Sequence, residues 1–115
     1  MDATASRPPD QHYSKLHFIP EFAKLRGIRF RWNENKAKLN IKNHEVSFEQ
    51  ATQVFFDPLV QYQDASRSNE ARDGALGCDF NFRVLFVVHL EIEEDFIRVI
   101  SARKAEPHER ESYET

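Results

Sequence analysis

The sequence predicts an α+β fold in which helices cover one face of an antiparallel sheet. Three features indicate this. Segments with helix caps and helical periodicity lie in residues 33–57, apolar runs typical of strands fill residues 83–103, and Pro107 opens a polar helical segment. The 115 residues, 40% of them hydrophobic, suit one domain with one core. We divide the chain into a partly disordered N-terminal extension, residues 1–26, and a domain, residues 27–115.

The domain is expected to begin with a strand and two helices. The stretch "IRFRW" from Ile28 alternates apolar and basic residues, which is typical of a half-buried strand. Either Asn33 or Asn35 is placed to cap the helix that follows. Ser47 and Gln50 have the spacing of a capping box. The second helix, "SFEQATQVFFDPL", carries an apolar stripe that ends at its Asp-Pro step.

After Pro58 the apolar period changes to two, which predicts a meander of three or four strands. "LVQY" and "ALGC" are short strands joined by a polar connection. "RVLFVVHLE", residues 83–91, is almost continuously apolar and is therefore expected to be a central strand buried on both faces. "FIRVISAR", residues 96–103, returns antiparallel to it. A final helix begins at Pro107 and carries "HERESYE".

Composition narrows the classes of function. The net charge of −3 argues against a general nucleic-acid coat protein but permits a local basic site. The single Cys78 excludes an internal disulfide and a multi-cysteine zinc site, and cytoplasmic location is the default. No apolar window approaches the ~20 residues of a membrane-spanning helix. The sequence has no phosphate loop, dinucleotide turn or nucleophile elbow, so we expect no cofactor, and no histidine pair is spaced to share a metal.

Candidate binding residues gather where the last strand meets the last helix. Ser101 and Arg103 share a face there. The arginines that flank or lie within the predicted sheet are Arg72, Arg83, Arg98 and Arg103. Arginine binds phosphate through paired hydrogen bonds, but such residues more commonly form ion pairs, for which Glu70, Glu91 and Glu93 are available. The junction therefore holds either a phosphate or a polar helix that covers the sheet.

Two histidines and one tyrosine also admit two interpretations. His44 ends the first helix, where its charge is favourable against the helix dipole. His89 interrupts the central strand and is either structural or a proton carrier. Tyr113 is most simply a packing residue. The residues alone therefore indicate an α+β domain with a candidate anion site on its sheet, and they do not choose a function.

Several motifs, in the right order, resemble the BrnT family of type II toxins. "FRWNENKAKLNIKNHEVSFEQATQVFFDPL" is similar to the family opening, which has an aromatic-W-D-x-x-K-A-x-x-N segment, a K-H-G-V-S-F-E-E-A helix start and a D-P-L stop. "NEAR" stands at the family's E-E-R element, and "RVLFVVH" resembles a family strand. "IRVISARKAEPHERESYE" resembles I-R-I-I-S-A-R-K-A-x-x-x-E-R-x-x-Y-E. The resemblance runs from Ile28 to Glu114.

The resemblance implies a RelE-like ribonuclease fold, with an N-terminal strand and two helices packed on an antiparallel β-meander and a C-terminal helix. It implies a metal-independent endoribonuclease that inhibits translation and growth, has no cofactor and is neutralised by a BrnA-type antitoxin. Operator DNA would be reached only through that antitoxin. The resemblance also implies a role for each residue at a matching position. Arg103 would hold the scissile phosphate, and Arg72 would be the second cation. His89 would transfer a proton, with His44 as its substitute, and Glu70 and Tyr113 would orient an arginine or help to donate a proton.

The sequence also departs from the family pattern at a few positions. The family's K-H-G reads Asn43-His44-Glu45, and the second acid of E-E-R is Ala71. A second interpretation is therefore a toxin-fold binding module that acts only in antitoxin binding and operon co-repression. A third is a stand-alone domain of unrelated function whose C-terminal motif reflects the fold alone.

Overall fold

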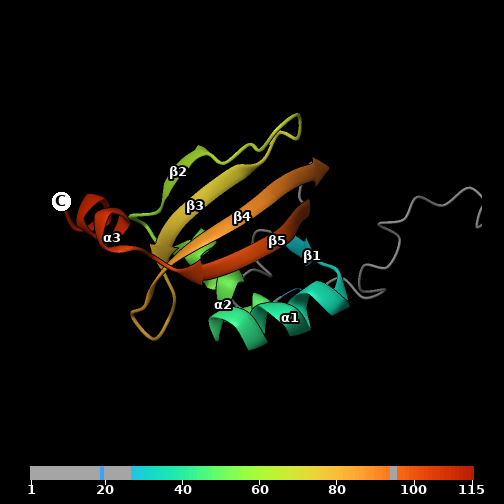
Figure 1. Ribbon diagram of the computed structural model, residues 1–115, viewed down its shortest axis with the longest axis horizontal. Coiled ribbons are helices and arrows are strands. Elements are labelled where there is room, and N and C mark those ends of the chain that lie inside the picture. The colour runs from blue at the N-terminus through green and yellow to red at the C-terminus, as the bar shows by residue number, and fades with distance from the viewer. Residues whose placement is uncertain (1–18, 20–26, 94–95) are drawn as a thin grey trace, which may run out of the picture.

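The computed structural model describes residue 19, residues 27–93 and residues 96–115. The predicted N-terminal extension, apart from residue 19, lies outside the described residues and stays a prediction. In chain order the elements are β1 (Arg29–Arg31), α1 (Glu34–His44), α2 (Phe48–Thr52), the 3₁₀ helix η4 (Gln53–Phe56), β2 (Gln61–Asp64), β3 (Asp73–Cys78), β4 (Val84–Glu93), β5 (Phe96–Lys104) and α3 (Pro107–Glu114). Figure 1 shows these elements around one curved sheet.

The sheet has five strands in the order β1-β5-β4-β3-β2. Strands β2 to β5 form the predicted antiparallel meander, with β4 in the middle. The expectation of an antiparallel sheet throughout was wrong at one edge, because β1 pairs parallel to β5, from Arg29 opposite Phe96 to Arg31 opposite Arg98. No hairpin joins these two strands, so no local turn signal sets their relative direction. The α+β class is confirmed, with a mixed sheet.

The core lies between one face of the sheet and the segment from α1 to η4. α1 and α2 pack on β5, and η4 packs on β3. Trp32 meets Phe48 edge to face with their ring centroids 5.8 Å apart, and both side chains are buried. Burying a large apolar side chain contributes about 1.5–3 kcal/mol. None of the helices in the described ranges is long and apolar enough to cross a membrane.

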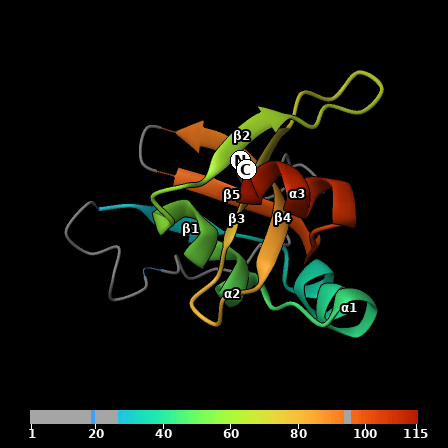
Figure 2. The ribbon, with the colours of Figure 1, turned by 90° about the vertical axis from the view of Figure 1, so that its left-hand side faces the viewer.

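The third helix lies at one end of the sheet and does not join the other helices on its face (Figures 1 and 2). Pro107 opens α3, as predicted, and Glu106 and Glu109 form its capping box. The Tyr113 hydroxyl donates a hydrogen bond to the Asp57 carboxylate, which also accepts from the Cys78 amide at 2.8 Å. This carboxylate therefore ties α3 to the end of β3.

The predicted caps of the first two helices are present. Asn33, rather than Asn35, caps α1 and accepts a hydrogen bond from the Lys36 amide at 3.0 Å. Ser47 and Gln50 form the predicted capping box of α2. At the end of α1, Glu45 adopts a left-handed conformation with φ of 60°. Glycine takes this conformation most easily, which explains why a K-H-G pattern suits this position.

A buried asparagine joins α1 to β5. The Asn40 side-chain amide donates to the carbonyls of Val46, at 2.8 Å, and Ala102, at 2.7 Å. Its oxygen accepts from the Ala102 amide at 3.1 Å. The pairing of β1 with β5 ends at Arg98, so Asn40 satisfies backbone groups on a part of β5 that β1 does not reach.

We expect Asn40→Ala to lower the free energy of unfolding by about 2–4 kcal/mol, because it leaves buried backbone groups of Ala102 and Val46 without partners. Urea denaturation measures the loss. Asn43→Ala is the matched control, since Asn43 lies exposed on the same helix and should change stability by less than about 0.5 kcal/mol. Equal losses in the two variants would show that the buried hydrogen bonds of Asn40 contribute no more than helix propensity.

Candidate active site

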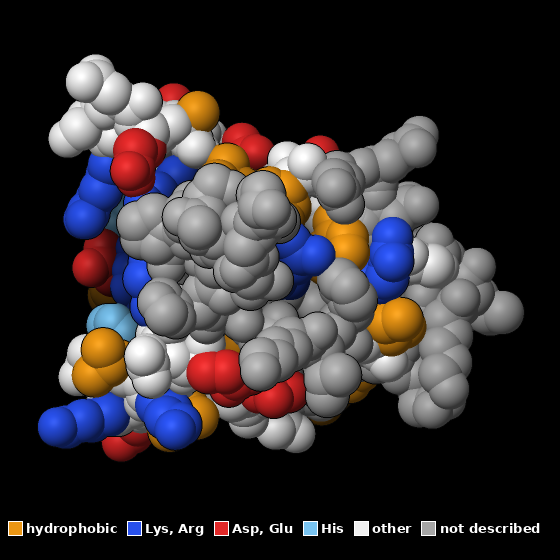
Figure 3. All heavy atoms as spheres, turned by 90° about the vertical axis from the view of Figure 1, so that its right-hand side faces the viewer, with side chains coloured by type: hydrophobic (Ala, Val, Ile, Leu, Met, Phe, Trp, Pro, Cys, Tyr) orange, Lys and Arg blue, Asp and Glu red, His pale blue; other side chains and the backbone are white. Residues whose placement is uncertain are grey.

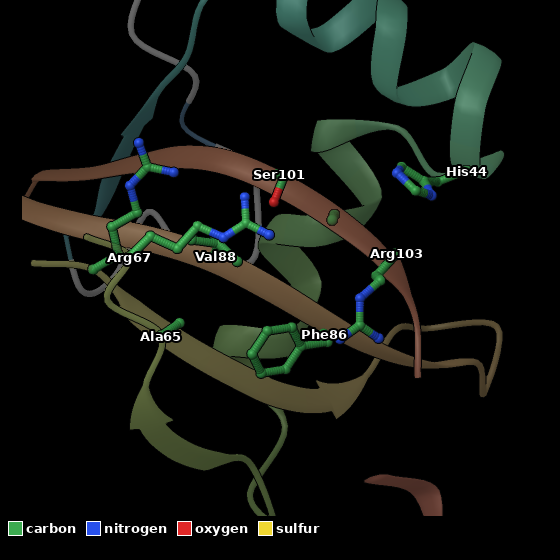
Figure 4. Close-up of a pocket in the computed structure, with 9 residues that line it drawn as sticks. His44, Ala65, Arg67, Phe86, Val88, Ser101 and Arg103 are labelled. Carbon is green, nitrogen blue, oxygen red and sulfur yellow. The ribbon is translucent and has the colours of Figure 1, made fainter. Parts of the chain in front are cut away.

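A pocket of about 340 Å³ lies on the face of the sheet opposite the core. Phe86 and Val88 of β4 reach it, while the alternate residues Leu85 and Val87 are buried in the core. Arg103 of β5 lies opposite Phe86 in the strand register. The complete lining is His44, Ala65, Arg67, Arg72, Phe86, Val88, Ser101, Ala102 and Arg103. We call it the arginine pocket (Figure 4).

Arg103 is held in place by two neighbours. Its Nη1 and Nη2 donate to the two carboxylate oxygens of Glu109 at 2.8 and 2.9 Å. The guanidinium carbon also lies 4.8 Å from the centroid of the Phe86 ring. The hydrogen bond from Arg103 lowers the pKa of Glu109, and the same bond raises the pKa of Arg103. Both groups therefore stay charged at neutral pH.

The ion pair leaves one edge of the Arg103 guanidinium available. Nη1 also donates to the Lys104 carbonyl at 3.2 Å, so the guanidinium's hydrogen bonds to the described residues use Nη1 and one hydrogen of Nη2. The Nε–H and the second Nη2–H have no hydrogen-bond partner among the described residues. These two donors lie on one side of the planar group and match two oxygens of a phosphate. Glu109 therefore orients Arg103 without saturating it.

The other two arginines come from the connection between β2 and β3. Arg72 forms an ion pair with Glu70, whose side chain is 68% exposed. An ion pair of this exposure is worth little and is easily exchanged for another anion. Arg67 also lines the pocket, and its backbone pairs with that of Glu70 in an isolated bridge. The sequence reasoning missed Arg67, because a polar loop carries no periodic signal that shows where a side chain lies.

His44 enters the pocket from the last residue of α1. It lies at the same end as Arg103, and Arg67 lies at the other end (Figure 4). Asn40, one turn earlier in α1, bonds to the residue before Arg103, so the helix is fixed beside the strand that carries the cation. The arrangement places one imidazole and three guanidinium groups around the same pocket.

His89 does not reach the arginine pocket. It lies on the other face of the sheet, where its ring meets that of Phe55 in η4 edge to face, with the centroids 4.7 Å apart. Burial lowers the pKa of His89, so this ring is neutral at pH 7. The sheet therefore separates His89 from Arg103, and the geometry favours His44 for any chemistry that involves this arginine.

Glu70 and Tyr113 have different relations to the pocket. Glu70 is its neighbour through the ion pair with Arg72. Tyr113 is not part of the lining, and its hydroxyl donates to Asp57, whose carboxylate also accepts from the Cys78 amide at the end of β3. Burial and the Asp57 carboxylate raise the pKa of Tyr113, so the phenol stays protonated. These contacts are compatible with a packing role for Tyr113, and its place among the catalytic residues stays a prediction.

The arginine pocket has a strongly basic lining. Three arginines and a histidine line it, and no carboxylate does so among the residues that the structure describes. Figure 3 shows Lys and Arg side chains along one margin of the face it draws, with a histidine among them and acidic groups close by. The positive charge is therefore local, which is compatible with a net charge of −3. Such a pocket suits an anion with several oxygens.

One group of potential metal ligands occurs among the described residues, and it consists of Glu106, His108 and Glu109. Both oxygens of Glu109 are engaged by Arg103, while Glu106 and His108 are exposed. We assign no metal to this group.

Gly74 of β3, which has no side chain, lies beneath the Phe86 ring that lines the pocket. A Cβ added to Gly74 would lie 2.5 Å from the tip of the Phe86 ring. Because β3 has glycine there, the Phe86 ring can occupy this space while it contacts the guanidinium of Arg103. Gly74 thus acts on Arg103 through Phe86.

Comparison with known families and solved structures shows what this chain is similar to. Residues 32–109 match the family model described as the ribonuclease toxin BrnT of type II toxin–antitoxin systems. The chain is also similar to the crystal structure of the Brucella abortus ribonuclease toxin BrnT, with 21% identity and a TM-score of 0.49, over 65% of this chain and 92% of that chain. Comparison with curated proteins gives no match. Since the family model covers more than half of the sequence, the chain belongs to the BrnT family of ribonuclease toxins of type II toxin–antitoxin systems.

Proposed function

We propose that this protein is a metal-independent endoribonuclease toxin whose active site is the arginine pocket. The observation that carries the proposal is the lining itself, three guanidinium groups with an imidazole and no carboxylate among the described lining residues. Carboxylates are the usual protein ligands of Mg²⁺ and Ca²⁺, and three arginines would repel such an ion. Arginines supply instead the positive charge that phosphoryl chemistry requires.

In the proposed reaction the ribose 2′-hydroxyl attacks the adjacent phosphorus. The bond from the 2′-oxygen to phosphorus forms, the bond to the 5′-oxygen breaks, and a cyclic phosphate and a free 5′-hydroxyl result. The free edge of Arg103 would hold two phosphate oxygens and stabilise the charge that develops on them. Arg72 would exchange Glu70 for the same phosphate or its neighbour.

Proton transfer is assigned to His44. Imidazole exchanges protons near neutral pH, and His44 is the titratable lining residue that is not an arginine. It would accept the proton of the 2′-hydroxyl. The 5′-oxygen would leave as an alkoxide whose negative charge a nearby guanidinium stabilises, and it would then take a proton from solvent water to give the 5′-hydroxyl.

The proposed partner is a BrnA-type antitoxin. Membership of a type II toxin–antitoxin family supports a protein antitoxin. We infer that it neutralises the toxin by covering the arginine pocket, whose three cations would otherwise bind RNA. Operator DNA would be bound by the antitoxin and not by this chain, which is acidic overall.

A binding module without catalysis is the second candidate. It is favoured by one observation, that Arg72 and Arg103 are both paired with carboxylates in this structure. This candidate requires that the purified, folded protein binds its antitoxin but does not cleave RNA, whether or not ribosomes are present.

We expect Arg103→Ala and Arg103→Lys to lower the rate of RNA cleavage by about 10²–10³-fold, because neither side chain offers paired donors to a phosphate. End-labelled RNA, cleaved in excess chelator, gives the measurement. Arg110→Ala is the matched control, since Arg110 is exposed on α3 and does not line the pocket. Arg103→Ala also leaves the buried carboxylate of Glu109 without its partner. The Arg103→Ala/Glu109→Gln variant removes that unpaired charge and so shows whether activity is still lost when only the cation is missing. Cleavage at the parent rate in these variants would remove Arg103 from the site.

We expect His44→Ala to lower cleavage by about 10²-fold or more, as loss of a general base does. His89→Gln should retain the parent rate after correction for the fraction folded, because the sheet separates this residue from the arginine pocket. The same RNA assay and a parallel unfolding curve provide the two readouts. The reverse order of effects would move proton transfer to the other face of the sheet.

We expect Gly74→Ala to lower kcat at least tenfold, because the new methyl group displaces the Phe86 ring that supports Arg103. Overpacking of this kind also costs about 1–3 kcal/mol of stability. Gly77→Ala on the same strand is the matched control, since its Cβ would approach Val54 on the core side at 3.1 Å. If both variants lose stability and activity in the same proportion, Gly74 has no positioning role.

A further inference from the structure

A second pocket, of about 390 Å³, lies on the opposite face of the sheet. Its lining comes from η4 and four strands and consists of Phe55, Tyr62, Asp73, His89, Glu91 and Ile97. Two cross-strand pairs build it, because Asp73 lies opposite His89 and Glu91 lies opposite Ile97. We call it the acidic pocket. The proposed reaction uses none of its residues.

The buried histidine of this pocket has a ring nitrogen without a partner. His89 is 5% exposed, and its Nδ1 lies 3.5 Å from the Val87 carbonyl. Its Nε2 has no hydrogen-bond partner among the described residues. Edge-to-face contacts with Phe55 and Tyr62, whose ring centroids are 4.7 and 6.1 Å away, fix the ring. Nε2 is not one of the buried side-chain atoms without a partner in the described part of the chain, so it is open to the pocket and can accept a hydrogen bond from a ligand.

The two carboxylates of the pocket are also unpaired. Asp73 and Glu91 are exposed, and neither side chain forms an ion pair or hydrogen bond with the described part of the chain. No lysine or arginine is among the lining residues. The pocket therefore presents two anions, one acceptor nitrogen and aromatic rings. A ligand that matches all of these groups is a cation rich in donors.

The distances between these groups indicate which kind of cation the pocket suits. A metal ion needs ligand atoms that converge, yet Asp73, His89 and Glu91 do not form a convergent group among the described residues. A planar organic cation spans more widely separated acceptors. Guanidinium has five donors in one plane and stacks on aromatic rings such as those of Tyr62 and Phe55.

We propose that the acidic pocket binds the guanidinium group of an arginine side chain of the antitoxin. The inference rests on the proposed antitoxin partnership and adds a contact on the face opposite the arginine pocket. Asp73 and Glu91 would pair with the cation, the His89 nitrogen would accept one of its hydrogen bonds, and the Tyr62 ring would cover it. Removing one partner of a charge pair that is desolvated at an interface weakens binding strongly, because the other charge is left unpaired.

The first experiment tests the chemistry of the pocket with methylguanidinium. Titration into the full chain, followed by the NMR signals of the His89 and Tyr62 rings, should give saturable shifts that methylammonium at equal ionic strength does not. Asp73→Asn/Glu91→Gln should weaken binding at least tenfold. The control, Glu49→Gln/Glu111→Gln, removes two acids outside the pocket and should leave binding unchanged. Equal effects of the two cations, or of the two double variants, would overturn the proposal.

The second experiment tests the source of the cation. The cognate antitoxin should bind Asp73→Asn/Glu91→Gln at least tenfold more weakly than it binds the parent or the Glu49→Gln/Glu111→Gln control, while RNA cleavage by all three is equal. Equal antitoxin affinity for the three proteins would overturn the proposal, even where methylguanidinium binds. Absence of antitoxin binding to the parent protein would instead contradict the proposed toxin–antitoxin function.

Discussion

The hydrogen bonds between Asn40 and Ala102 connect the helical layer to the sheet at the point where the arginine pocket is built. The strand β1 covers only the first part of β5, as far as Arg98. Beyond it, backbone groups of β5 face α1, and the amide of Asn40 supplies both the donor and the acceptor that a neighbouring strand would have offered. This contact places the end of α1 next to Arg103, and so brings His44 and Arg103 to one end of the same pocket. An apolar residue at position 40 would fill the space but would leave these backbone groups unpaired.

The cations of the pocket depend on a second layer of residues. Glu109 holds one edge of the Arg103 guanidinium, and the Phe86 ring supports its face. A flexible arginine loses side-chain entropy when it binds a phosphate, and a guanidinium that is already oriented loses less. Arg72 is less constrained, because its partner Glu70 is exposed. The pocket therefore combines one fixed cation with others on a loop, which suits an anion whose charge and shape change during a reaction.

The features that the sequence predicted well depend on local signals. The caps at Asn33 and Ser47, the opening of α3 at Pro107 and the strand meander follow from neighbouring residues and short-range periodicity. The parallel pairing of β1 depends on a partner far along the chain. The face on which His89 lies was also not predictable, because β4 is apolar at successive positions and shows no alternation that would distinguish its two faces. Arg67 lies in a polar loop, whose sequence does not indicate where its side chain points.

The two pockets have opposite charge and lie on opposite faces of one sheet, which constrains any protein that binds both. The faces meet along the edge formed by β2, where Tyr62 borders the acidic pocket and the following connection carries Arg67 and Arg72 into the arginine pocket. A partner that anchors on one face and covers the other therefore has its shortest path around this edge. In the proposed reaction RNA uses only the arginine pocket, and the carboxylates of Asp73 and Glu91 would repel it. Under the two proposals, the difference in charge between the faces would let a protein inhibitor gain affinity from a surface that the substrate does not use.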